Sequence, residues 1–489
     1  MTSCRTVSSI DFLEQSALWI AAVGDLVVAL GTSLHALLRK RDVRSTIGWV
    51  GLIWLVPVFG PILYLILGVN RIHRAALLGR ASLRTRRHPS LVEPVLPDDV
   101  AAQASQPHLS ALARLTNAIA DRPMLPGNRV VVLHNGDEAY PEMLAAINGA
   151  KRSVSLSTYI FDVDEAGRVF VDALADAAGR GVQVRVLVDA AGARYGRPRI
   201  DKVLKKRGVR AALFMAAGRV RSLVYLNLRL HRKTLVVDGK TGFTGGMNIR
   251  QDHLLGSKPK FEVLDCHFRL EGPVVTQLQD VFAEDWEFTT GEALEGDHWF
   301  PELPPVGDVA ARGIGDGPDE DLDKMRWVIG GAIACAKHSV QIVTPYFLPD
   351  DALVNALNIA AMRGVQVDVL IPHRSNIALV EWATVAQLPH VLGHGVRVHR
   401  SAPPFEHTKL MIVDSAWVFF GSGNWDARSL RLNFEFNVEC YHPELASVLG
   451  RYVRERIATG SPVDRESMAA IPLPSQIRNG FARLFMPYL

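Results

Sequence analysis

The sequence predicts an α/β fold made of two repeated halves and preceded by an apolar helical region. Segments typical of strands and of amphipathic helices alternate over most of the chain, which favours helices layered on largely buried sheets. One string of polar residue types occurs twice at the same internal spacing, which indicates an internal repeat. At 489 residues the chain is too long for one ordinary hydrophobic core, so we expect two domains and an appendage.

Residues 1–72 contain two apolar stretches, which we expect to form a membrane hairpin of two helices. The first stretch, over 17–38, is long enough at about 1.5 Å per residue to cross a hydrocarbon core of about 30 Å. The second stretch, over 47–69, contains three residues that break or kink helices, namely Pro57, Gly60 and Pro61. A re-entrant hairpin is therefore the alternative to a second crossing.

The distribution of charged residues says more about how the protein is oriented in the membrane than the net charge of +4 does. Basic residues cluster at 39–44, 71–87 and 205–210. The two stretches predict a multi-pass protein. Basic residues follow both stretches, and the larger excess after the second favours a catalytic part on the cytoplasmic side. Clusters beside apolar segments favour anionic lipid surfaces, with solvated faces as the alternative. Asp25 interrupts the first stretch; a position near the membrane interface is favoured, with a functional residue as the alternative.

Beyond residue 72 the chain is expected to divide into a basic, proline-rich linker over 73–110, a first lobe over 111–292, an interlobe linker over 293–322 and a second lobe over 323–489. In the first lobe the pattern predicts strands over 129–133, 153–161 and 182–188 and helices over 138–150 and 168–180. The second lobe repeats this order with helix 325–336, strand 339–347, helix 352–363 and strand 365–371. The sequence Arg-Gly-Val-Gln-Val occurs in both lobes, so the repeat extends beyond the polar string.

The repeated string has a lysine two residues after a histidine, an aspartate five further on, and an asparagine ten beyond that, behind a small glycine-containing turn. The first copy is His231, Lys233, Asp238, Gly245, Gly246 and Asn248. The second copy is His407, Lys409, Asp414, Gly421, Ser422 and Asn424. In each copy an apolar, β-branched run follows the lysine and ends at a turn, which predicts a strand entering a hairpin with return strands at 241–244 and 417–420.

Residues two apart on a strand share a face, so each histidine is expected to point the same way as the lysine of its own copy. The aspartates Asp238 and Asp414 complete the candidate catalytic set of each motif. They lie an odd number of residues from the histidines, however, and therefore on the opposite face of the strand. A role in the turn or as a structural hydrogen-bond acceptor suits them better than that of a catalytic acid. The small residues Gly246 and Ser422 are expected to let the backbone approach a ligand closely.

These residue types suit reaction at a phosphodiester. The phosphorus needs a nucleophile, the leaving oxygen needs a proton, and the non-bridging oxygens need positive charge. Two imidazoles, two ammonium groups and two carboxamides from the two halves supply all three. The alternating segment Asn433, Glu435, Asn437 presents further polar side chains on one face, and Asp265 occupies a comparable place after the first copy.

The two strings resemble the paired HKD motifs of the phospholipase D superfamily. Five longer runs are similar to bacterial cardiolipin synthases: Tyr159-Ile160-Phe161, HRKTLVVDGKTGFTGGMNI from His231, HFRLEGPVV from His267, TPYFLPD from Thr344 and SLRLNFEFN from Ser429. The resemblance covers nearly the whole chain, including the apolar region, and implies two phospholipase D-like α/β sandwich lobes related by an internal pseudo-two-fold repeat. Leu230 and Glu406, which precede the two histidines, depart from the family's pattern, and either is a candidate to shift the preference between acceptor alcohols.

The resemblance also implies an enzyme of the bacterial inner membrane that transfers a phosphatidyl group from one phosphatidylglycerol to another. The products are cardiolipin and glycerol, and the intermediate is a phosphatidyl-histidine. The histidine of the first copy, His231, is implied as the nucleophile and that of the second copy as the acid and base. The family's pattern implies that Asn248 and Asn424 hold phosphate oxygens with the lysines, and that Glu435 and Asp265 orient the histidines.

No cofactor is expected, because exchanging one phosphodiester for another needs no nucleotide, and four cationic or amide donors make a metal unnecessary. The cysteines Cys4, Cys266, Cys335 and Cys440 match no metal spacing and are expected to be reduced thiols. Anionic phospholipid and the membrane are the expected partners, and nucleic acid is not.

Alternative functions stay open from the residues alone. With water as acceptor the enzyme is a phospholipase D hydrolase, and another phosphatidyl transferase is also compatible. A nuclease would use the same motifs, but the apolar region is not what such an enzyme needs. A non-enzymatic membrane adaptor would require decayed motifs, and here they are intact.

Residues 477–489 carry apolar residues at helical spacing around Arg478 and Arg483, and predict a helix that docks on lipid or packs on the second lobe.

Overall fold

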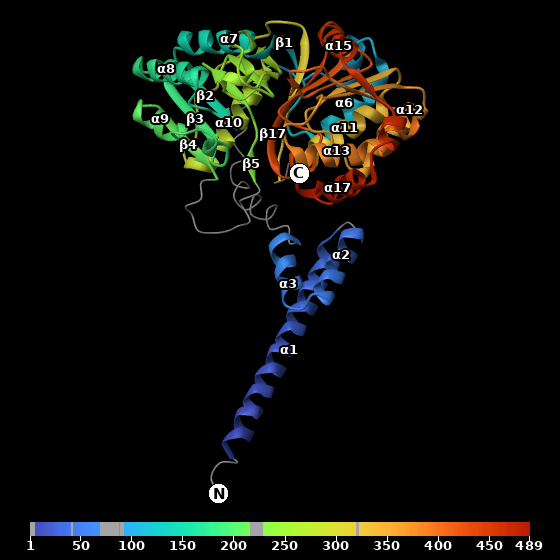
Figure 1. Ribbon diagram of the computed structural model, residues 1–489. Helices are drawn as coiled ribbons and strands as arrows, with labels where there is room; N and C mark the ends of the chain where they lie inside the picture. Colours follow the sequence, from blue (N-terminus) through green and yellow to red (C-terminus); the bar gives the residue numbers. More distant parts are fainter. Residues whose placement is uncertain (1–4, 41–42, 69–87, 89–91, 216–227, 319–321) are drawn as a thin grey trace. The chain divides into compact units, whose positions relative to one another are not determined.

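The computed structural model describes residues 5–40, 43–68, 88, 92–215, 228–318 and 322–489 (Figure 1). The chain divides into two compact units. Unit 1 comprises residues 1–75 and 221–226, and unit 2 comprises residues 76–220 and 227–489. The predicted basic cluster at 71–87 lies outside the described residues.

Unit 1 holds one helix that is long and apolar enough to cross a membrane. Among the described residues, Ser16–Arg39 within α1 (Arg5–Arg39) meets this condition alone. The second apolar stretch is broken near its first proline, as predicted, into α2 (Val43–Leu55), α3 (Phe59–Leu63) and the π-helix η1 (Tyr64–Gly68). Each of these is too short to cross by itself, so the described residues support one candidate crossing and not the predicted two.

Polar contacts within unit 1 connect the broken segment to α1. The backbone N of Val58, at the start of α3, donates to Asp25 Oδ1 at 2.8 Å. The Nδ1 atom of His35 lies 2.7 Å from the hydroxyl of Tyr64. The helix α2 therefore runs along α1 as far as Asp25, and α3 with η1 returns towards His35. Asp25, which the sequence led us to place near the membrane interface, here accepts a hydrogen bond from the backbone at this reversal.

Unit 2 is an α/β structure with 18 strands among the described residues, of which 16 form the main sheet and two, β8 and β14, form a separate two-stranded sheet (Figure 1). The strands before residue 292 are β1 (Leu125–His134), β2 (Ser153–Thr158), β3 (Gln183–Asp189), β4 (Arg210–Phe214), β5 (Arg229–Leu230), β6 (Thr234–Val237), β7 (Thr241–Gly245), β8 (Val263–Leu264) and β9 (Cys266–Glu271). The later strands are β10 (Val309–Asp316), β11 (Ser339–Val343), β12 (Gln366–Ile371), β13 (Arg397–Arg400), β14 (Phe405–Glu406), β15 (Leu410–Val413), β16 (Trp417–Gly421), β17 (Asn433–Tyr441) and β18 (Ser461–Val463).

The helices of unit 2 lie before, between and after these strands. They are α5 (Pro97–Gln103), α6 (Ser110–Ile119), α7 (Asn135–Gly149), α8 (Glu165–Gly179), α9 (Ile200–Lys206), α10 (Val274–Thr290), α11 (Lys324–Cys335), α12 (Asp351–Met362), α13 (Ala378–Val391), α14 (Ala427–Arg431), α15 (Pro443–Ala458), α16 (Arg465–Ala469) and α17 (Leu473–Arg483). Every strand and helix predicted from the alternating pattern overlaps an observed one, so that part of the prediction is confirmed.

The main sheet consists of two half-sheets that present corresponding strands in the same order from their outer edges inward. The first half-sheet has the order β4-β3-β2-β6-β7-β9-β1. The second has the order β13-β12-β11-β15-β16-β17-β10, with β18 added outside β13. In each, three strands pair in parallel and a hairpin follows (β6–β7 and β15–β16), so both predicted hairpins are confirmed.

A hydrophobic cluster joins the two half-sheets. Phe268 on β9 stacks on Phe420 of β16, with ring centroids 3.7 Å apart. Val275 and Leu278 of α10 and Phe436 of β17 are buried in the same cluster. Because both halves contribute to this core, separating them would expose apolar surface from each.

Two segments that composition predicted to be linkers contain secondary structure and buried side chains. Val100 and Leu109, within the predicted 73–110 linker, are buried in the same hydrophobic cluster as Val328 of α11 and other residues of the second half. Within the predicted 293–322 linker, β10 lies between β1 and β17. A Cβ atom at Gly313 would lie 2.6 Å from the Phe436 ring, so glycine here reflects close strand packing and not a loop.

Candidate active site

Each motif histidine directly follows a two-residue strand that pairs with the other half of unit 2. The strand β5 pairs in parallel with the start of β17, and His231 N donates to the Phe434 carbonyl at 3.0 Å. The strand β14 pairs in parallel with β8, and His407 N donates to the Leu264 carbonyl at 2.8 Å. Backbone pairing across the halves therefore positions both imidazoles.

The carboxylates that contact the histidines are exchanged between the halves. His231 Nδ1 lies 2.9 Å and 3.0 Å from the two carboxylate oxygens of Glu435 on β17. His407 Nδ1 lies 2.7 Å from Asp265 Oδ2, between β8 and β9. Both carboxyl groups are fully buried, whereas the imidazoles keep slight exposure. Each half thus supplies a histidine to one pair and a carboxyl group to the other.

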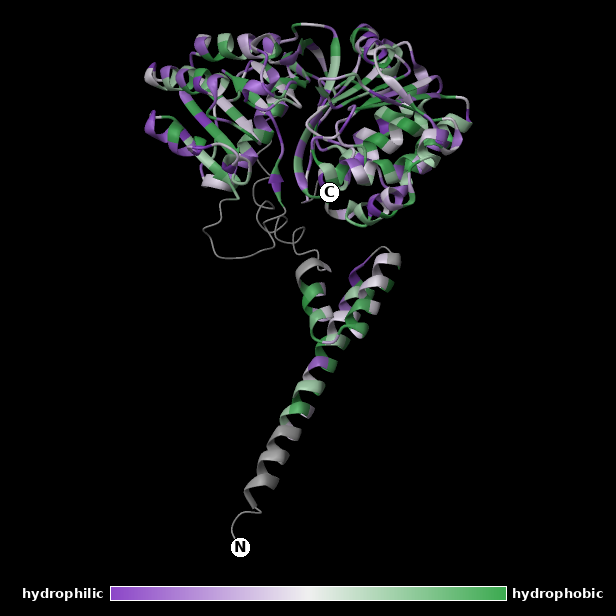
Figure 2. Ribbon diagram, in the orientation of Figure 1, coloured by the Kyte–Doolittle hydropathy of each residue, from purple (hydrophilic) through white to green (hydrophobic). Residues whose placement is uncertain are grey.

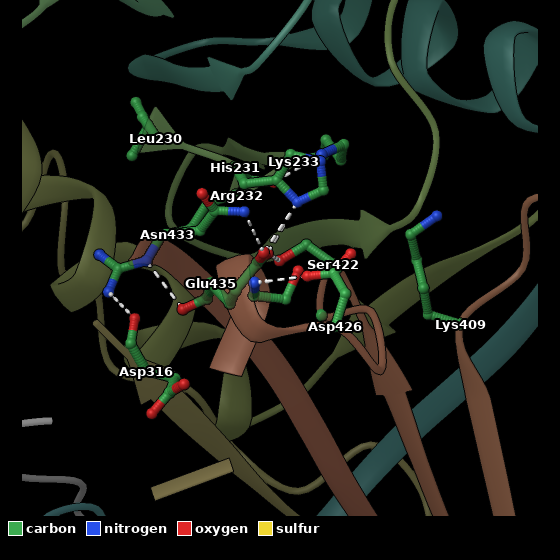
Figure 3. Close-up of polar contacts among 12 residues, drawn as sticks. Leu230, His231, Arg232, Lys233, Asp316, Lys409, Ser422, Asp426, Asn433 and Glu435 are labelled. Carbon is green, nitrogen blue, oxygen red and sulfur yellow. Dashed lines mark hydrogen bonds and ion pairs between the residues drawn. The ribbon is translucent and has the colours of Figure 1, made fainter. Parts of the chain in front are cut away.

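Glu435 is surrounded by hydrogen-bond donors (Figure 3). Besides His231, the Ser422 hydroxyl donates to Oε2 at 2.5 Å and Asn433 Nδ2 donates to Oε1 at 3.1 Å. Burial alone would raise the pKa of Glu435, but the charges and hydrogen bonds of His231, Lys233 and Ser422 outweigh it and lower that pKa. Glu435 is therefore an ionised acceptor.

Asp265 has fewer donors. Burial raises its pKa to about 8, although the nearby Lys409 opposes the rise. Its Oδ1 atom is buried and has no hydrogen-bond partner within the described part of the chain. A Cβ atom at Gly246, the counterpart of Ser422, would lie 2.6 Å from Asp265 Oδ2. Glycine is needed there to make room for the carboxyl group, and it brings no hydroxyl donor.

The small residues before the asparagines therefore act on the carboxyl groups. We predicted that Gly246 and Ser422 would let the backbone approach a ligand, but Gly246 packs against Asp265 and Ser422 donates to Glu435. The difference between glycine and serine at this position gives the two imidazole–carboxyl pairs different electrostatics.

Burial and neighbouring positive charge keep the imidazoles neutral. Burial lowers the pKa of His231 to about 4, with Lys233 adding to the effect, and lowers that of His407 well below its ordinary value. Burial also lowers the pKa of Lys233 to about 7 and that of Lys409 to about 8. Because Lys409 contributes to lowering the pKa of Lys233, the two motifs lie in one electrostatic environment.

The lysine ammonium groups turn back towards their own histidines. Lys233 Nζ donates to the His231 carbonyl at 2.6 Å and lies 5.7 Å from the centre of the Tyr159 ring. Lys409 Nζ donates to the His407 carbonyl and lies 3.0 Å from His407 Nδ1. Two ammonium groups beside two neutral imidazoles suit the binding of an anion.

The two asparagines lie at equivalent positions after the hairpins, and both are buried. Asn248 Oδ1 accepts from Ile160 N at 3.0 Å, which fixes the carboxamide. Asn424 Oδ1 is buried and has no hydrogen-bond partner in the ranges that the structure describes. The expected role of both in holding phosphate oxygens stays a prediction.

The motif aspartates lie away from the histidines, at the far ends of β6 and β15. Asp238 accepts backbone N–H groups of residues 151, 152 and 153, with its closest contact 2.7 Å from Arg152 N. Asp414 accepts those of residues 337, 338 and 339 and also lies 2.6 Å from His108 Nε2. Both have positive φ in their hairpin turns, 53° and 50°. Their place in the candidate catalytic set is therefore wrong, and the opposite parity explains why.

The middle residue of each His-x-Lys string also connects the halves, which the sequence reasoning missed. Arg232 is buried, donates to the Glu435 carbonyl at 3.0 Å and pairs with Asp285 at 2.7 Å. At the corresponding position, Thr408 Oγ1 accepts from Cys266 N at 3.1 Å. Strand parity already placed Arg232 on the face opposite the histidine, and an arginine facing the protein interior requires an acidic partner.

Glu406 also faces away from the histidines. It is fully buried, and its Oε2 accepts from the Tyr452 hydroxyl at 2.8 Å and from Arg456 Nε at 3.2 Å. It therefore anchors α15 to β14, and its considered role in acceptor preference stays a prediction. The described residues contain no group of three or more histidine, cysteine or acidic side chains arranged to hold a metal.

The paired histidines, lysines and asparagines on two repeated half-sheets define a phospholipase D-like protein. The comparison with known families agrees, because the cardiolipin synthase, PLD-like domain matches twice, at residues 143–286 and 329–457. A phospholipase D-nuclease N-terminal family matches residues 17–68. The chain belongs to the cardiolipin synthase family of phospholipase D-like enzymes.

Individual relatives match over nearly their whole length. The major cardiolipin synthase ClsA of Bacillus subtilis (strain 168) is 32% identical over 465 residues, covering 92% of this chain and 95% of that protein. The cardiolipin synthase of Geobacillus kaustophilus (strain HTA426) is 30% identical over 459 residues, covering 92% and 90%. Among solved structures, phosphatidylserine synthase of Haemophilus influenzae Rd KW20 has a TM-score of 0.60 at 14% identity, covering 77% of this chain and 100% of that one. At that identity the likeness concerns the fold.

Proposed function

We propose that the site transfers a phosphatidyl group from one phosphatidylglycerol to another, which yields cardiolipin and glycerol. The observation that carries the proposal is the exchange of Glu435 and Asp265 between the halves, which gives one site two oriented imidazoles. The lysines beside these imidazoles and the two motif asparagines are proposed to supply donors for an anionic phosphodiester. Membership of the cardiolipin synthase family supports the choice of lipid.

In the proposed first half-reaction His231 Nε2 attacks phosphorus and the bond to the glycerol oxygen breaks. Glu435 supports this assignment, because as an ionised acceptor it accepts a hydrogen bond from Nδ1–H and so favours the tautomer in which Nε2 is unprotonated. The pair of His407 and Asp265 gives the departing oxygen its proton. The raised pKa of Asp265, to about 8, supports a shared proton on that pair at neutral pH.

In the second half-reaction the free hydroxyl of another phosphatidylglycerol gives its proton back to His407 and attacks the phosphatidyl-histidine. The bond between phosphorus and Nε2 of His231 breaks, and both pairs return to their starting protonation. Lys233 and Lys409 neutralise the charge on the non-bridging oxygens in both steps.

The two half-sheets are proposed to be lobes related by a pseudo-two-fold axis, which the matching strand order and the double family match support. In unit 1 we propose that α1 crosses the bacterial inner membrane while α2 and α3 form a re-entrant hairpin beside it. The contacts of Val58 with Asp25 and of Tyr64 with His35 support that reversal, because they satisfy polar groups within the protein. The catalytic lobes are proposed to face the cytoplasm.

The test is to incubate the purified protein with phosphatidylglycerol vesicles and no nucleotide. Cardiolipin and free glycerol in equal amounts are expected. Phosphatidic acid as the main product would favour hydrolysis, and a product formed only with added phosphatidylethanolamine would favour a different donor or acceptor. Configuration at phosphorus should be retained, since two displacements each invert it. Replacing either His231 or His407 by alanine should abolish transfer while membrane insertion persists.

A further inference from the structure

We propose that the carboxyl-terminal helix α17 lies in the headgroup region of an anionic bilayer, as a second membrane contact beside the active site and additional to α1. The inference rests on the proposed function in one respect, since that function makes the substrate a bilayer lipid. The surface itself is defined by exposed apolar side chains of α17 and the residues that follow it.

An apolar stripe runs along the outer face of α17. Its members recur at three- and four-residue spacing and are exposed: Leu473 at 66%, Ile477 at 64%, Phe481 at 62%, Leu484 at 71% and Phe485 at 40%. The opposite face is buried, where Asn479 and Ala482 pack against the protein. A helix with one face already packed and large apolar residues on the other has the shape of an interfacial helix.

The charge around this stripe is positive. Between Glu466 and the last residue the sequence contains no aspartate or glutamate, and its charged side chains are Arg478 and Arg483. The Arg478 guanidinium lies 4.7 Å from the centre of the Trp382 ring, and Arg483 Nη1 lies 2.8 Å from His390 Nε2. Both are therefore held at the edge between α17 and α13, where they complement anionic headgroups.

A small buried cluster and the Tyr346 ring connect α17 to the active site. Ala482 packs with Leu348 and Val380 in a small buried cluster, against which Tyr346 also packs. The Tyr346 ring lies 6.4 Å from that of His407. In unit 2, α17 lies at the same end as β5, after which His231 follows, and α15 lies at the opposite end (Figure 1). A bilayer against α17 would present lipid headgroups close to the histidines.

The narrow width of the exposed stripe favours a lipid partner over a second copy of the chain. Apolar and polar residues are mixed over most helices of unit 2, and α17 shows the same mixture in sequence (Figure 2). Its exposed side chains form a stripe one helix wide, which suits insertion to a depth of about 5–10 Å and not a broad protein interface.

The test measures the surroundings of α17 in the full-length protein reconstituted into phosphatidylglycerol vesicles. A nitrobenzoxadiazole dye is attached to cysteine in Phe481→Cys, with Cys4 and Cys335 replaced by serine. Cys266 and Cys440 are buried and stay. The matched control is Val448→Cys on α15, which is 47% exposed at the opposite end. Lipids carrying a spin-label quencher near the headgroup should quench the dye at 481 and leave that at 448 unchanged.

Equal quenching at the two positions, or none at 481, would overturn the proposal. Self-quenching between dyes at 481 that increases with protein density, without quenching by lipid, would assign the stripe to a contact between copies and also overturn it. These outcomes do not involve turnover, so they are independent of the proposed reaction.

An activity measurement separates the two proposals further. The quantity compared is the ratio of the rate on phosphatidylglycerol vesicles to the rate on a short-chain, monomeric phosphatidylglycerol. In Phe481→Gln this ratio should be about tenfold lower than in the unaltered protein. Val448→Gln should leave that ratio as in the unaltered protein. A ratio unchanged in Phe481→Gln would contradict the docking of α17. Absence of cardiolipin from both substrates in the unaltered protein would instead contradict the proposed function.

Discussion

Removing the hydroxyl of Ser422 tests how the two imidazole–carboxyl pairs divide the chemistry. In Ser422→Ala the shape of the buried turn is nearly kept, and Glu435 loses the donor that lies 2.5 Å from its Oε2. Asn433 and His231 still donate to the same carboxylate. The substitution therefore weakens the ionised form of Glu435 without removing the carboxyl group.

The size of the effect follows from this one contact. A hydrogen bond to a charged group contributes about 1.5–3 kcal/mol, and one pKa unit corresponds to about 1.4 kcal/mol. The pair of His231 and Glu435 should therefore take up its first proton at a pH about one to two units higher. That proton blocks the nucleophile, so activity falls as pH decreases through the pKa of the pair. The acidic limb of the rate profile, governed by the pKa of about 4 for His231, should move towards neutral pH.

The assay is the rate of cardiolipin formation between about pH 4 and pH 9, with kcat and KM separated at each pH. The expected result is a shifted acidic limb in kcat, with little change in KM. Ser155→Ala is the matched control, because the buried Ser155 hydroxyl has no hydrogen-bond partner within the described residues. An acidic limb in Ser422→Ala that coincides with that of Ser155→Ala would refute the reasoning.

Three further predictions concern groups around the site. Activity should fall as pH rises through the pKa values of about 7 for Lys233 and about 8 for Lys409, because both lose their charge there; an alkaline limb well above pH 9 would contradict this. Asp414→Asn should lower the free energy of unfolding by about 2–4 kcal/mol in urea titrations and leave kcat of the folded enzyme nearly unchanged, since its carboxylate binds backbone N–H groups. Arg232→Lys keeps a positive charge but loses the bond to the Glu435 carbonyl, so kcat should fall about tenfold with bound-lipid affinity retained; loss of affinity alone would argue against a positioning role.

Much of the fold, and the choice of candidate site residues, followed from local sequence patterns. The spacing of each string predicted a strand, a turn and a return strand, and the hairpins at Asp238 and Asp414 have this form. Period-two parity also separated those aspartates from the histidines, which the structure supports. Such inferences succeed because the side-chain period of a strand is a local property.

The relations between distant residues did not follow from the sequence. Glu435 was expected to orient a histidine, but nothing local indicated that it would contact His231, 204 residues away, instead of the nearer His407. The linker prediction over 293–322 did not anticipate β10 for a related reason, because Gly313 of this strand packs against Phe436. A glycine that is required by close packing between strands cannot be distinguished by composition from a glycine in a loop.

The exchange of carboxyl groups bears on when the protein becomes active during its synthesis. A growing chain that has released its first motif contains His231 but not yet Glu435, and His407 must reach back 142 residues to Asp265. Chains fold from their amino-terminal parts as they emerge, and the membrane region emerges first. In the proposed scheme the nascent protein is then anchored in the membrane with a complete first motif, while His231 still lacks the carboxylate that orients it. It acquires activity towards the surrounding lipid only after β17 has been made and paired.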